Sequence, residues 1–94
     1  MSMDLGQKVR EIREAEELGR HAFSQVTDIP KQTLINIETG KSAPSGKHLA
    51  AVSKAFTKYT LWLMADQTDE ACGQISPEIE RARSALKKTG TDTD

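Results

Sequence analysis

Apolar residues recur at intervals of three and four along most of this chain, which is the pattern of amphipathic helices. The spacing predicts a first helix from about Asp4 to about Glu17, with Leu5, Val9 and Ile12 on its inner face. The carboxylate at Asp4 is well suited to cap the start of this helix.

Residues 19–38 predict two short helices joined by a tight turn. Asp28 tolerates the left-handed conformation that ends a helix, and Pro30 has the fixed φ that suits the start of another. Ile29 lies between them and is expected to fill the angle between the helices. The apolar positions of the two helices are Ala22, Phe23, Val26, Leu34 and Ile37.

The outward side of the second of these helices is mostly polar. It carries Lys31, Gln32, Thr33, Ile35 and Asn36. Basic and amide side chains are the types that bond to phosphates and to base edges. The pattern therefore indicates a helix-turn-helix that reads DNA.

Two further helices are expected before residue 65. Gly40 directly follows the reading helix, where a left-handed terminator belongs, and Ser45 is a suitable N-cap for a fourth helix that reaches Phe56. A short fifth helix begins at Tyr59 and ends near Met64. It is apolar on more than one side, so we expect it to be buried against the core and against a second subunit.

The C-terminal third predicts a polar connector, one more helix and a tail. The run Ser76-Pro77-Glu78 combines a capping serine, a proline at the first helical position and an acid near the positive helix end. This sixth helix is expected to end near Lys88. We assign residues 1–65 to the DNA-binding domain, 66–88 to a connector and helix of the same domain or a dimerisation element, and 89–94 to a disordered tail. The apolar stripe of the sixth helix is Ile75, Ile79, Ala82 and Leu86.

Composition narrows the class of protein. The chain has 94 residues, 36% of them hydrophobic, and a formal net charge of −1, so we expect one domain with a small core and specificity from base contacts rather than from bulk charge. The charges are distributed unevenly along the chain. Residues 1–58 hold nine Lys/Arg against seven Asp/Glu, whereas residues 59–94 hold four Lys/Arg against seven Asp/Glu. A single cysteine, Cys72, and the lack of a signal peptide or a long apolar run predict a cytoplasmic protein.

Residues 5–64 resemble the Cro/phage-repressor (XRE-like) helix-turn-helix family. LGQKVREIREAEEL resembles its first helix, HAFSQVTDIPKQTLINIETGKSAP its second and third helices with the following loop, and Leu61-Trp62-Leu63-Met64 its last helix. The ending LINIETGKSAPS is the most specific segment. The resemblance implies an all-α fold, a compact five-helix lambda-repressor-like DNA-binding domain with an additional C-terminal helix.

The resemblance also implies roles for individual residues. Base contacts are expected from Lys31, Gln32, Thr33 and Asn36. Backbone contacts are expected from Arg20, Lys41, Ser42 and Lys47. Arg13 lies near the inner side of the first helix, which is unusual for a charged residue. It is expected either to form a structural ion pair with Glu38 or to lie at the edge of the core with its guanidinium in solvent. Apart from the resemblance, a dimer interface is expected from Leu61, Trp62 and Met64, with Ile79 and Leu86 of the sixth helix packing over the core or making contacts across the two-fold axis.

One departure from the family pattern concerns the start of the second helix. The family has Ser-Gln there, and the glutamine bonds a phosphate and braces the reading helix. This chain has Gly19-Arg20 instead. Arg20 can still hold a phosphate through a charge-assisted contact, but it does not supply the amide that would brace Gln32.

These features predict a repressor of phage or prophage type, encoded by a bacterium or its phage, that binds a palindromic DNA operator as a homodimer. A toxin or RNA polymerase is a further candidate partner. The alternatives are an antitoxin that neutralises a toxin and represses its own operon, and a protein-binding module without DNA. No spacing of His, Cys, Asp or Glu predicts a metal site, and no cofactor motif or catalytic constellation is visible.

Overall fold

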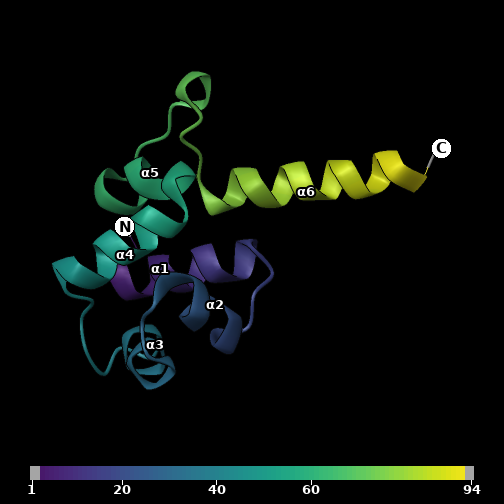
Figure 1. The fold of residues 1–94 in the computed structure, drawn as a ribbon. Helices are drawn as coiled ribbons and strands as arrows, with labels where there is room; N and C mark the ends of the chain where they lie inside the picture. The colour runs from purple at the N-terminus through teal and green to yellow at the C-terminus, as the bar shows by residue number, and fades with distance from the viewer. Residues whose placement is uncertain (1–2, 93–94) are drawn as a thin grey trace.

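The computed structural model describes residues 3–92, with side chains up to residue 87, and this part of the chain folds into helices (Figure 1). Its only β-type pairing is an isolated bridge between Asp69 and Gln74. The prediction of an all-α fold with five helices and an additional C-terminal helix is confirmed for the described residues. The elements are α1 (Leu5–Ala15), α2 (Arg20–Thr27), α3 (Lys31–Glu38), α4 (Gly46–Ala55), η1 (Thr57–Tyr59), α5 (Thr60–Ala65), η2 (Glu70–Cys72) and α6 (Pro77–Asp92).

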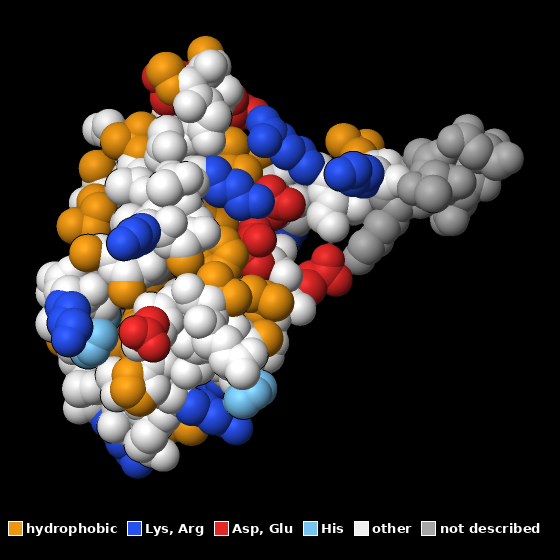
Figure 2. Space-filling view, viewed as in Figure 1, with side chains coloured by type: hydrophobic (Ala, Val, Ile, Leu, Met, Phe, Trp, Pro, Cys, Tyr) orange, Lys and Arg blue, Asp and Glu red, His pale blue; other side chains and the backbone are white. Residues whose placement is uncertain are grey.

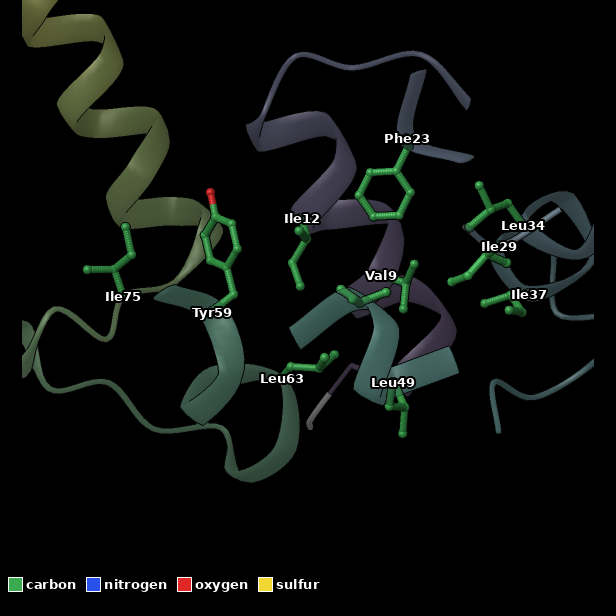
Figure 3. Packing of buried hydrophobic residues seen from close by; sticks show 11 residues of the cluster. Val9, Ile12, Phe23, Ile29, Leu34, Ile37, Leu49, Tyr59, Leu63 and Ile75 are labelled. Carbon is green, nitrogen blue, oxygen red and sulfur yellow. The ribbon is translucent and has the colours of Figure 1, made fainter. Parts of the chain in front are cut away.

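The core lies around α1, which contacts α3, α5 and α6. Figure 3 shows Ile12 of α1 between Tyr59 and Phe23, with Val9 beside Phe23. The Phe23 ring stacks on the Phe56 ring, with centroids 5.5 Å apart and an interplanar angle of 5°. This stack joins α2 to the end of α4. The buried hydrophobic cluster is Val9, Ile12, Phe23, Ile29, Leu34, Ile37, Leu49, Val52, Tyr59, Leu63 and Ile75.

The predicted inner face of α2 is wrong at its last turn. Val26 is 53% exposed, whereas the neighbouring Thr27 is buried. The Thr27 hydroxyl donates to the Phe23 carbonyl at 2.8 Å and accepts from the Ile29 amide at 3.4 Å. Because these bonds satisfy the buried hydroxyl, the threonine can occupy the inner position. Leu5 likewise lies at the edge of the core, with 37% of its surface exposed.

Helix ends follow the local signals of the sequence. The Asp4 carboxylate accepts from the Gln7 amide at 2.8 Å, which confirms the predicted N-cap of α1. Ser45 caps α4 and forms a capping box with His48, whose Nδ1 accepts from the Ser45 amide at 3.2 Å. Gly40 adopts a φ of 82°, as the predicted left-handed terminator requires.

A buried lysine joins α1 to α5. Lys8 is only 4% exposed, and its Nζ donates to the carbonyl of Trp62 at 2.9 Å and to that of Leu63 at 3.3 Å. It also pairs with the Asp66 carboxylate just after the helix. A cation at a helix C-terminus also interacts favourably with the carbonyls of the last turn. Lys8 therefore adds to the left-handed cap of α5, in which the Asp66 amide donates to the same Trp62 carbonyl at 3.0 Å.

The start of α6 is fixed to the domain. Ile75 is 1% exposed and Ile79 packs against the core cluster. Two ion pairs hold the first turns: Lys58 with Glu80 at 3.0 Å, and Arg81 with Glu11 at 2.7 Å. The first turns of α6 thus pack on the same core as α1.

The rest of α6 extends away from the helical body (Figure 1). The helix continues to Asp92, so the predicted disordered tail is wrong for residues 89–92, and residues 93–94 lie outside the described part of the chain. No proline follows Lys88. A helix that has already formed can therefore add one backbone hydrogen bond for each further residue.

Candidate nucleic-acid interface

The turn between α2 and α3 is held by hydrogen bonds on both sides. Asp28 has a φ of 62°, the left-handed conformation expected from the sequence, and its amide donates to the Ser24 carbonyl at 2.8 Å. The Ser24 hydroxyl donates to the Ile29 carbonyl. Ile29 is 2% exposed and fills the angle between the helices, as predicted. These contacts fix the orientation of α3 relative to α2.

The two sides of α3 differ sharply in exposure. Leu34 and Ile37 point into the core, at 0% and 2% exposure. Lys31 and Gln32 are exposed on the opposite side, and Thr33, Ile35 and Asn36 are half-buried there. The four residues assigned to base contacts therefore share an accessible side of α3. Within this set, Gln32 Nε2 donates to Asn36 Oδ1 at 3.2 Å.

The expected backbone-contacting residues flank α3. The Lys41 and Ser42 amides both donate to the Asn36 carbonyl, at 2.9 and 3.2 Å, so the loop folds back against the end of α3. The side chains of Lys41, Ser42 and Lys47 are exposed. Figure 2 shows Lys and Arg side chains as separate spots rather than as one continuous block on the face that it displays.

Glu38, the last residue of α3, is the centre of a buried ion-pair network. Its side chain is 0% exposed and its oxygens accept from Arg13 Nε at 2.9 Å and Arg13 Nη2 at 3.0 Å. The expected Arg13–Glu38 pair is thus present. Arg13 Nη1 also donates to the Leu18 carbonyl at 2.9 Å. The hydrogen bonds to Glu38 raise the pKa of the Arg13 guanidinium, although partial burial opposes this.

Arg20 joins the same network, which the sequence did not predict. Its Nε lies 3.1 Å from Glu38 Oε1, and its side chain is 31% exposed. The carboxylate of Glu38 thereby ties the start of α2 and the inner side of α1 to the end of α3. The sequence carries no local signal for this contact, because Arg20 and Glu38 lie 18 residues apart.

The five residues assigned to a dimer interface are not equally accessible. Trp62 and Ile79 are partly buried and pack against the core of their own chain. Leu61 is half-buried, and its backbone amide donates to the Gln74 side chain at 2.9 Å. Met64 and Leu86 remain 57% and 73% exposed. The apolar fifth helix is therefore covered in part by its own chain, where it contacts α1 and η1.

The described part of the chain contains no group of three or more His, Cys, Asp or Glu side chains placed to hold a metal ion. Within that same part, none of the helices has the length and apolar character needed to cross a membrane.

A rigid two-helix unit that buries one side of its second helix and exposes a polar side defines a helix-turn-helix protein. Residues 9–63, more than half of the chain, match the model of the helix-turn-helix family. The chain belongs to this family, in its Cro/phage-repressor form. It is similar to Repressor protein C of Escherichia phage P2, with 35% identity over 81 residues that cover 84% of this chain and 82% of the phage protein.

Proposed function

We propose that this protein is a sequence-specific, double-stranded DNA-binding transcriptional repressor of the phage type. The observation that carries the proposal is the exposed polar side of α3, held rigidly by the turn and by the Glu38 network. A preorganised helix loses little freedom on entering the major groove, so more of its interaction energy is available for binding. The likeness to a phage protein named as a repressor supports the direction of regulation.

In the proposed complex, the N-terminal part of α3 lies in the major groove. Lys31, Gln32, Thr33 and Asn36 face the base edges, where amides suit adenine and lysine suits guanine. Lys41, Ser42 and Lys47 lie beside the phosphate backbone. Arg20 donates one N–H to Glu38, and its guanidinium has further donors for a phosphate. Phosphate contacts fix the register, and base contacts supply the specificity.

Two copies would bind a roughly palindromic operator. The two α3 helices would then enter successive major grooves about 34 Å apart. Met64 and Leu86 are large apolar side chains that remain exposed on α5 and α6, which makes these helices the preferred contact between copies. A dimer seated on a promoter excludes RNA polymerase, and this is the proposed route to repression.

The proposal is tested by recovering genomic DNA fragments on the purified protein and sequencing them. One palindromic motif should be enriched, and its affinity should fall with salt. Lys41 and Lys47 provide at least four cationic contacts in a dimer, so the slope of log K against log salt should be roughly −3.6 or steeper. Absence of any enriched motif, or affinity that is insensitive to salt, would contradict the proposal.

A further inference from the structure

Gln32 and Asn36 form one hydrogen-bonded unit on the exposed side of α3. They lie one helical turn apart, and Gln32 Nε2 donates to Asn36 Oδ1 at 3.2 Å. Gln32 is exposed and Asn36 is half-buried. Two side chains on a DNA-facing surface are thus already coupled before any DNA is bound.

The neighbouring helix offers Gln32 no comparable partner. Arg20, which stands where the family has its bracing glutamine, directs its Nε to Glu38 at 3.1 Å. The Ser24 hydroxyl of the same helix is engaged with the Ile29 carbonyl. Among the described residues, the side chain that orients Gln32 therefore comes from α3 itself.

Asn36 is the shorter and the less exposed member of the pair. Its backbone carbonyl accepts from the amides of Lys41 and Ser42, at 2.9 and 3.2 Å, which ties the backbone of this residue to the loop after α3. Gln32 has a longer side chain with more rotatable bonds, so the hydrogen bond restricts the Gln32 side chain more than it restricts that of Asn36. Asn36 therefore positions Gln32, rather than the reverse.

The remaining donors and acceptors predict which bases the pair can read. After giving one N–H to Asn36, the Gln32 amide keeps one N–H and its oxygen. One donor beside one acceptor matches N7 and the N6 amino group of adenine. The Asn36 oxygen is already engaged, while both of its N–H groups are free to meet an acceptor such as thymine O4 or guanine O6.

We propose that Asn36 is a positioning residue, so that the pair reads one adenine through Gln32 and an acceptor-bearing base next to it through Asn36. The two side chains are not independent adenine readers. This inference rests on the proposed function, because it concerns the specificity of the same DNA-facing surface.

The test uses the full chain and a duplex selected from a random double-stranded library. Each position of the selected duplex is then replaced by the other three base pairs, and affinities are measured for four proteins: the wild type, Gln32→Ala, Asn36→Ala and Asn36→Asp. The position at which Gln32→Ala abolishes the preference for adenine identifies the base that Gln32 reads. That preference should fall by roughly 5- to 150-fold, the range of a good bidentate contact.

Asn36→Ala should reduce the preference at this same position at least threefold, although alanine is not placed to touch that base. Asn36→Asp keeps an oxygen that accepts from Gln32, so it should retain the adenine preference while it loses the preference at the adjacent position. Added negative charge should weaken its binding to every duplex. Thermal unfolding of each variant keeps an effect on folding separate from an effect on base preference.

Unchanged adenine preference in Asn36→Ala would overturn the inference and leave the proposed function standing. Loss of that preference in Asn36→Asp would also overturn it, because the acceptor is retained there. Failure of the wild type to select any duplex would overturn the proposed function and this inference with it.

Discussion

Replacement of Glu38 by alanine is expected to cause a large loss of stability, because it removes a fully buried carboxylate that pairs with two arginines. The Glu38 side chain is 0% exposed, and that of Arg13 is 12% exposed. Without Glu38, the Arg13 guanidinium stays largely out of water and keeps the Leu18 carbonyl at 2.9 Å as its partner. Removing one partner of a buried pair costs about 3–5 kcal/mol, which is a large part of the total for a small domain.

Urea unfolding followed by far-UV circular dichroism measures this cost. In thermal unfolding, the same cost should lower the Tm by about 12 °C or more. Glu14→Ala is the matched control, because Glu14 lies on the surface at 38% exposure and pairs there with Arg10 at 3.2 Å and with Arg81 at 3.7 Å. Each of these exposed pairs is worth about 0.2–1 kcal/mol. If Glu38→Ala cost no more than this control, the account of the buried network would be refuted.

Two further substitutions test the packing and the charge network. A Cβ at Gly6 would overlap the carbonyl oxygen of Ile37, so Gly6→Ala should destabilise the fold by about 1–3 kcal/mol, whereas Gly46→Ala, with open space around it, should be neutral or stabilising in the same urea titration. Burial, together with the hydrogen bond that its hydroxyl gives to Glu16, raises the pKa of Tyr59 above its ordinary value of 10.0. Because the pKa is raised in the folded state, the stability from this group is present below pH 10 and is lost as the pH rises further. Unfolding free energies measured between pH 8 and pH 11 should therefore fall more steeply for the wild type than for Tyr59→Phe, and equal slopes would contradict the assignment.

Local signals were sufficient to predict the helix-turn-helix frame. Asp4 and Ser45 cap helices, and Asp28 leaves one, through contacts with residues close in the sequence. The buried positions Leu34 and Ile37 follow from helical spacing alone. The polar side of α3 follows for the same reason, since it is the complement of that stripe.

Contacts between distant residues were not predictable in the same way. Lys8 looks like a surface charge in the sequence, but the carbonyl of Trp62, 54 residues later, makes its burial favourable. Arg20 was expected to serve a phosphate, and its partner Glu38 lies 18 residues away. Val26, expected on the inner face, is exposed, and Thr27 is buried instead because its hydroxyl finds backbone partners within its own turn. Each case depends on partners that periodicity does not reveal.

The central claim, that the exposed side of α3 reads DNA bases, is tested most directly by comparing Gln32→Ala with Gln7→Ala. Both variants remove one exposed glutamine, but Gln7 lies on α1, away from the proposed interface. Affinities should be measured for the selected duplex and for a scrambled duplex of equal length. Gln32→Ala should lose about 1–3 kcal/mol of binding free energy on the selected duplex only, while Gln7→Ala should bind both duplexes as the wild type does. Equal affinities of the two variants for the selected duplex would contradict base reading by α3.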